Sequence, residues 1–166
     1  MAKAMKSVIR SQLPVKSIIA NDFGVIDYWD SFRITKPIKE SLDKIAADIF
    51  TTEPRWVKSL MSVRNSLVRI FGLKTDKLNQ KEIKNFYPVG SRLAHFTVLD
   101  RNEYEIVLGE DDKHLNFRTS VFIDKANSSI YLSTIVQFNN IGGKIYFFPV
   151  KPFHRFIIKS CLKSQL

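Results

Sequence analysis

Hydrophobic residues at helical spacing organise the first half of the chain. Apolar side chains recur three or four positions apart over residues 37–50 and again over residues 54–71, so each stretch presents one apolar face. A proline stands at the start of each stretch, where its missing N–H is tolerated, and Gly72 follows the second. The pattern predicts two successive helices, preceded by a short strand over residues 25–34.

From residue 91 onward the helical spacing gives way to the two-residue alternation of β-strands. Four alternating segments are separated by polar turns, which is the pattern of an antiparallel meander. If Ile123 pairs with Ile130, the apolar residues of the last two segments share one face of the sheet. The four segments cover residues 91–99, 103–109, 115–123 and 129–138. With the first strand, about five strands are expected.

The C-terminal residues 141–162 return to helical spacing and predict a long final helix. Pro149 and Pro152 are expected to kink or interrupt it. Its apolar stripe comprises Tyr146, Val150, Phe153, Ile157 and Cys161. The element order predicts an α+β fold in which a curved antiparallel sheet wraps one long C-terminal helix, with an αα unit after the first strand. We expect a single domain over residues 1–166, with an irregular N-terminal arm at 1–24.

Composition excludes several classes of protein. The chain has 166 residues, 45% of them hydrophobic, which is far from the composition of a disordered protein and enough for one core without disulfides or metals. Residues 1–20 hold no apolar run of the length a signal peptide needs, and the longest uncharged run, residues 126–143, is too polar to span a membrane. A single cysteine, Cys161, fits a reducing compartment, so a cytoplasmic location is expected.

The net charge of +10 is unevenly distributed along the chain. Residues 54–92 hold nine basic and two acidic residues, residues 139–166 hold five basic and none acidic, and residues 100–112 hold six acids. Such basic stretches favour anionic partners, but no nucleic-acid-binding motif accompanies them, so nucleic acid is not expected. Transient contact with an anionic membrane surface is one interpretation. A general contribution to solubility is the other.

Charged residues of the predicted sheet are candidates for binding. The acidic turn at residues 110–114 has carboxylates and one histidine but no recognised metal-ligand spacing, so a solvated hairpin tip without metal is expected, and no cofactor is predicted. Glu105 and Arg118 lie within predicted strands, where each either faces water or enters a cavity and needs a partner. Each is therefore either a ligand anchor or a surface residue.

Three further residues have two interpretations each. His95 and His154 could act as acid or base, but neither has the spacing of a catalytic triad. His154, on the final helix, is either a hydrogen-bonded structural histidine or a polar group in a cavity. Arg64 is either a surface residue with a buried stem or a contact for an anionic head group. No catalytic residue is assigned.

Several short motifs resemble an uncharacterised bacterial family known only as a domain of unknown function. More distantly, the order of elements is similar to the START and polyketide-cyclase (SRPBCC) helix-grip superfamily. That resemblance implies a cavity between the sheet and the C-terminal helix that holds an apolar or amphipathic small molecule. The motifs are Asp30-Ser31, Arg64-Asn65, Phe71-Gly72-Leu73-Lys74, the run from Gly109 to Arg118, and Pro152-Phe153-His154.

The function expected from these observations is a binding module that encloses such a molecule and performs no chemistry on it. One alternative is a cyclase- or hydrolase-like enzyme in the same cavity, with Glu105, His95 or His154 as acid or base. The other is an oligomerising interaction protein without a ligand. The candidate ligand contacts are Arg64, His95, Glu105, Arg118, Tyr146, Phe153 and His154, with Tyr146 and Phe153 expected to line the cavity opposite the sheet.

Overall fold

The fold is a seven-stranded antiparallel sheet with a long C-terminal helix packed against it. The computed structural model describes residues 7–51 and 84–166. The strands are β1 (Ile9–Arg10), β2 (Tyr28–Thr35), β3 (Arg92–Leu93), β4 (Phe96–Arg101), β5 (Glu105–Asp111), β6 (Leu115–Asp124) and β7 (Ser129–Phe138), and the helices are α1 (Leu42–Thr51) and α3 (Ile141–Lys163). The strands lie in the order β1-β2-β7-β6-β5-β4-β3, and the α+β class is confirmed.

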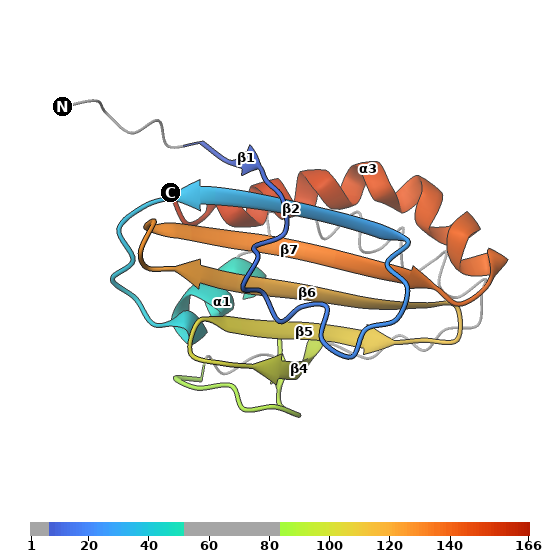
Figure 1. The fold of residues 1–166 in the computed structure, drawn as a ribbon, viewed down its shortest axis with the longest axis horizontal. Coiled ribbons are helices and arrows are strands. Elements are labelled where there is room, and N and C mark those ends of the chain that lie inside the picture. Colours follow the sequence, from blue (N-terminus) through green and yellow to red (C-terminus); the bar gives the residue numbers. More distant parts are fainter. Residues whose placement is uncertain (1–6, 52–83) are drawn as a thin grey trace.

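The two faces of the sheet carry different coverings (Figure 1). The two helices of the described residues lie on one face, where α3 packs against β2 and β7 and α1 packs against β5 and β6. On the other face, the chain between β1 and β2 crosses the sheet as an arm. Ile123 pairs with Ile130, as the alternation predicts, so the large apolar cluster of β6 and β7 faces the helices. Burial of each such side chain stabilises the fold by about 1.5–3 kcal/mol.

The first helix is shorter than predicted. It begins at Leu42 rather than at residue 37, because the Ser41 hydroxyl accepts a hydrogen bond from the Lys44 N–H at 3.2 Å and so caps the first turn. The second predicted helix, at residues 54–71, lies outside the described residues.

β1 was missing from the prediction, and the segment predicted at residues 91–99 is divided into β3 and β4 by a turn at Ala94 and His95. β1 and β3 each have only two residues, which is too short for alternation to be recognised. The first predicted strand also begins later, at Tyr28 rather than at residue 25. The Asp27 carboxylate accepts a hydrogen bond from the Phe138 N–H at 2.7 Å, which joins the start of β2 to the end of β7.

The final helix is continuous, and its buried face differs from the predicted stripe. α3 runs from Ile141 to Lys163 through both prolines without interruption. Phe153 is 49% exposed, while the buried face of the helix consists of Gly143, Phe147, Ile158, Cys161 and Leu162. The side of the helix that faces the sheet is therefore rotated relative to the predicted stripe. Apolar spacing alone could not distinguish Phe147, which is buried, from Phe148 and Phe153, which are exposed.

The acidic turn between β5 and β6 lies against the start of α3. Asn139 and Asn140 donate side-chain hydrogen bonds to the carbonyls of Asp112 and Lys113 at 2.6 and 2.8 Å. Gly143 lies so close that an added Cβ would stand 2.1 Å from the His114 carbonyl oxygen. The turn thus fixes the position where the helix begins.

Within the described residues, no helix is both long enough and apolar enough to cross a membrane.

Candidate functional site

A buried polar network joins β2 to α3 on the helix-covered face of the sheet. Asp30 is fully buried, and its Oδ2 atom accepts a hydrogen bond from the Tyr28 hydroxyl at 2.6 Å. His154 Nδ1 lies 3.1 Å from the same oxygen, although 124 residues separate the two side chains in sequence. The other oxygen of Asp30, Oδ1, is buried and receives no hydrogen bond from the residues that the structure describes.

The surroundings of this network explain its electrostatics. Burial, together with the hydrogen bond to Asp30 and the charge of Asp30, raises the pKa of Tyr28 to about 12, so the phenol stays protonated and remains a donor. Arg155 Nε donates to the Tyr28 oxygen at 3.3 Å, and this bond raises the pKa of Arg155. The Lys151 ammonium lies 5.2 Å from the Tyr28 ring centroid. The cations of Arg155 and Lys151 therefore lie at the edge of the network, near the buried carboxylate of Asp30.

An apolar cluster adjoins the polar network. Phe147 of α3 packs on Tyr28 with ring centroids 4.8 Å apart, and its ring lies 5.5 Å from that of Phe138. The His154 ring is 6.5 Å from Phe147, so the histidine lies between the aromatic cluster and Asp30. Its side chain is 22% exposed, whereas that of Asp30 is fully buried. The network thus reaches the surface through His154.

The arrangement permits hydrogen bonding and proton transfer. A buried carboxylate bonded to one ring nitrogen fixes the orientation of an imidazole, and a partly exposed imidazole can then exchange a proton at its other nitrogen. Among residues 7–51 and 84–166, no group of three or more His, Cys, Asp or Glu side chains could hold a metal ion.

Glu105 lies on the face of the sheet opposite α3. Its buried carboxylate accepts hydrogen bonds from the Ser17 hydroxyl and from the Ile18 N–H, both at 2.6 Å. Burial raises the pKa of Glu105, although these two bonds oppose the increase. Glu105 therefore holds the arm onto the sheet and cannot reach a ligand between the sheet and α3.

The other predicted site residues are dispersed. Arg118 also lies on the arm side and pairs with Asp111, with N–O distances of 2.6 and 3.2 Å. His95 stands in the turn between β3 and β4, with its ring 6.3 Å from that of Phe96. Tyr146 is half-buried on α3 and Phe153 is about half exposed, and Arg64 lies outside the described residues. Of the six candidates that the structure describes, only His154 belongs to the buried network.

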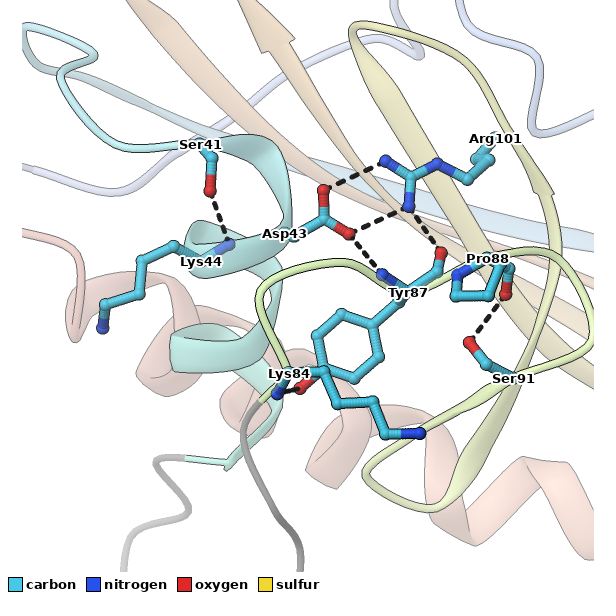
Figure 2. Close-up of polar contacts among 8 residues, drawn as sticks. All are labelled: Ser41, Asp43, Lys44, Lys84, Tyr87, Pro88, Ser91 and Arg101. Atoms are coloured by element: carbon cyan, nitrogen blue, oxygen red, sulfur yellow. Dashed lines mark hydrogen bonds and ion pairs between the residues drawn. The ribbon is translucent and has the colours of Figure 1, made fainter.

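A second ion pair positions α1 rather than forming a reactive centre (Figure 2). Arg101 of β4 donates to both oxygens of Asp43 at 2.9 and 3.0 Å, and the Tyr87 N–H donates to Asp43 at 2.7 Å. Burial alone would raise the pKa of Asp43, but these hydrogen bonds hold it below its usual range. Arg101 also covers the Phe86 ring at 4.0 Å. These hydrogen bonds join α1 to β4 and to the chain before β3, so this cluster has a structural role and holds the helix against the sheet.

A cavity of about 930 Å³ opens on the arm side of the sheet. Its lining includes Arg10 of β1, the arm residues 11–16, the strand residues Arg33, Phe122 and Tyr131, and the turn at residues 124–127. This volume lies on the face opposite the predicted ligand position.

Sequence reasoning missed Tyr28 and Asp30. The alternation of β2 places both on the same face as buried Phe32 and Ile34, where a carboxylate needs a specific partner. A charged residue within the apolar face of a strand was therefore the available signal. Two of the quoted motifs, Asp30-Ser31 and Pro152-Phe153-His154, meet at this point of the fold.

Comparison with known proteins adds a family and no function. No curated protein and no solved structure matches the chain. Residues 23–161 match the family described as "Protein of unknown function (DUF2867)", and this region contains Tyr28, Asp30 and His154 together with all of β2 to β7. The chain therefore belongs to the DUF2867 family of proteins of unknown function.

Proposed function

We propose that this protein binds an amphipathic small molecule between the sheet and α3, with Asp30 as the polar anchor. The observation that carries the proposal is the second oxygen of Asp30, which is buried and lacks a hydrogen-bond donor among the described residues. A buried polar atom without a partner costs about 1–3 kcal/mol. A ligand that donates an N–H or O–H group to this oxygen would remove that cost.

The neighbouring side chains indicate the kind of ligand. Phe147, Phe138 and Val136 supply an apolar wall beside the carboxylate. The buried hydroxyl of Thr134 lies on the same face, on β7 opposite Asp30, and that of Thr119 follows on β6 opposite Thr134. The arrangement suits a molecule with an apolar body and a hydroxyl or amine head. His154, which is partly exposed, stands where the head would enter.

The test measures binding of the neutral, mainly apolar fluorophore N-phenyl-1-naphthylamine, which carries one N–H donor. Asp30→Asn keeps the shape but turns one of the two oxygens into an NH₂ group, so a donor then faces either the ligand or the Tyr28 hydroxyl. We expect about tenfold weaker binding, the effect of losing one hydrogen bond to a charged group. Asp22→Asn, the same change at an exposed arm residue, is the control and should bind as the wild type does.

Native mass spectrometry of the purified protein provides the second arm of this test. A co-purified small molecule that is retained in Asp22→Asn and lost from Asp30→Asn supports the proposal. The proposal fails if the fluorophore binds both variants equally and no small molecule accompanies the wild type.

A second candidate function is acid–base catalysis on the same ligand. It is favoured by the Asp30–His154 pair, because a carboxylate that orients a partly exposed imidazole is the usual arrangement of a general base. Incubating the co-purified molecule in excess with the wild type distinguishes the two functions. A mass change that disappears in His154→Gln while binding persists indicates an enzyme. An unchanged mass indicates a carrier.

The outward face of α3 supports the proposed contact with an anionic membrane surface. Ile145, Phe148 and Phe156 are 62%, 82% and 65% exposed on this helix. The helix carries five basic residues and no acidic one. Apolar side chains flanked by cations favour a surface of anionic lipid.

Flotation with vesicles tests this contact. We expect binding to phosphatidylglycerol vesicles that weakens in high salt and in Phe148→Ser. Val15→Ser, which alters an exposed apolar residue of the arm, should leave binding unchanged. Equal binding to neutral phosphatidylcholine vesicles, or no effect of Phe148→Ser, would contradict the proposal.

A further inference from the structure

The cavity on the arm side of the sheet has a preformed floor. Arg33, Tyr131 and Phe122 stand side by side across β2, β7 and β6, because Arg33 pairs with Tyr131 and Tyr131 pairs with Phe122. The rings of Phe122 and Tyr131 lie 5.9 Å apart at an interplanar angle of 63°. Tyr104 lines the same cavity and has the Lys125 ammonium 5.6 Å from its ring centroid. Arg33 and three aromatic rings thus face a volume of about 930 Å³.

The arm that walls this cavity is attached at both ends. β1 pairs with β2, and the Ser11 N–H donates to the Ser31 carbonyl at 2.9 Å. At the other end, Ser17 and Ile18 donate to the buried carboxylate of Glu105. Such a wall keeps its shape without a ligand, so little ordering entropy is lost on binding.

The charges that line the cavity are unbalanced. Arg10, Lys16, Arg33 and Lys125 contribute four cations against the single carboxylate of Asp124. That carboxylate accepts two hydrogen bonds from Asn127, at 3.1 and 2.7 Å, which hold the pKa of Asp124 below its usual range. None of the ion pairs among the described residues involves any of the four cations. The positive potential is therefore available to a ligand.

We propose that this cavity binds an organic anion that carries an aromatic ring, of about the size of a mononucleotide. The ring stacks on the aromatic floor, and the anionic group pairs with Arg33 and the cations of the rim. The volume lies within the range of about 300–1,000 Å³ that is usual for small-molecule sites. This site is on the opposite face of the sheet from Asp30 and is independent of the function proposed above.

The test compares three probes by titration calorimetry. Adenosine monophosphate has both the ring and the anion, adenosine lacks the anion, and ribose 5-phosphate lacks the ring. We expect adenosine monophosphate to bind at least about tenfold more tightly than either of the others, since each lacks one of the two interactions. Its affinity should fall as salt concentration rises.

Two variants locate the binding. Arg33→Gln should weaken the binding of adenosine monophosphate about tenfold, which is the effect of losing a charge-assisted contact. Lys125→Gln changes an exposed turn residue, so it tests the site even if Arg33→Gln fails to fold. We expect Lys125→Gln to weaken the binding of adenosine monophosphate by about threefold to tenfold. Lys113→Gln, in the exposed turn of another hairpin and outside the cavity, is the matched control and should bind as the wild type does.

Three outcomes would overturn the assignment. The first is equal affinity for adenosine and adenosine monophosphate. The second is an equal loss of affinity in Lys125→Gln and Lys113→Gln. The third is binding of an eight-residue thymidylate strand more than tenfold tighter than that of the mononucleotide, which would replace the small molecule with single-stranded nucleic acid. None of these results affects the Asp30 proposal, because Asp30 lies on the other face of the sheet.

Discussion

Asp30 and His154 meet at 3.1 Å although one lies on the second strand and the other near the middle of the last helix. The contact brings a buried carboxylate oxygen to a partly exposed imidazole. The Tyr28 hydroxyl, on the same strand as Asp30, donates a hydrogen bond to that oxygen and completes the network. This pair links the position of α3 to the chemistry of the proposed ligand site. Changes at Asp30 should therefore be measurable at Tyr28.

Tyr28 should ionise at a higher pH than the ordinary pKa of a tyrosine, 10.0, would give. With a pKa of about 12, only about a tenth of Tyr28 is ionised at pH 11. The absorbance at 295 nm of the wild type minus that of Tyr28→Phe isolates this residue. Asp30→Asn removes the carboxylate charge that helps to raise the pKa, so the ionised fraction of Tyr28 at pH 11 should increase. Near-ultraviolet circular dichroism at pH 11 checks that the proteins remain folded, and an unchanged fraction in Asp30→Asn would contradict the network.

Glu105 should make the wild type less stable as the pH rises. Because burial raises the pKa of Glu105 in the folded protein above its usual value of 4.5, the folded state binds the proton more tightly than the unfolded state. Its contribution to stability is therefore present below pH 4.5 and is lost as the pH increases through the raised pKa. In Glu105→Gln this dependence should be absent. Urea unfolding at pH 4.5 and pH 8 measures the difference between the two proteins, and an identical pH dependence would refute the prediction.

Arg101 should be important for stability because it neutralises Asp43. The side chains are only 15% and 8% exposed, so Arg101→Met leaves a carboxylate with little compensation and should lower the free energy of unfolding by about 3–5 kcal/mol. In the double variant Asp43→Asn/Arg101→Met, part of that loss should be recovered. The exposed pair of Lys44 and Asp48 offers a control, and Lys44→Met should have little effect on urea unfolding. Equal stabilities of the Arg101 single variant and the double variant would show that the charge is not the cause.

Gly143→Ala should destabilise the attachment of α3 to the β5–β6 turn. The new Cβ would stand 2.1 Å from the His114 carbonyl oxygen, and backbone must move to make room, at a cost of about 1–3 kcal/mol. Gly142→Ala is the matched control in the same turn of helix. There the nearest atoms, at 3.0 and 3.2 Å, belong to the side chains of Asn140 and His114, which need to shift by only a few tenths of an ångström. Thermal unfolding should show a clearly larger loss for Gly143→Ala, and equal losses would count against this packing.

The sequence by itself determined the strand and helix content of the C-terminal half. Alternation is a local property, so it located β7 over Ser129–Phe138 and identified the pairing of Ile123 with Ile130. It also located α3 to within one residue at its end. The family resemblance likewise followed from short motifs, and the match over residues 23–161 confirms membership of a family of unknown function. The more distant superfamily stays a hypothesis.

Only the tertiary structure decided which polar residues meet. Sequence spacing cannot show that Asp30 faces His154, because that contact depends on how α3 crosses the sheet and on which side of the helix is turned inward. For the same reason, Glu105 and Arg118 appeared suitable as ligand anchors, although sheet pairing places them under the arm. The arm has no periodic pattern of its own. Its position comes from β1, from two hydrogen bonds to Glu105 and from the packing of Ile19 against Val107 and Ile135, which are long-range contacts that local sequence does not encode.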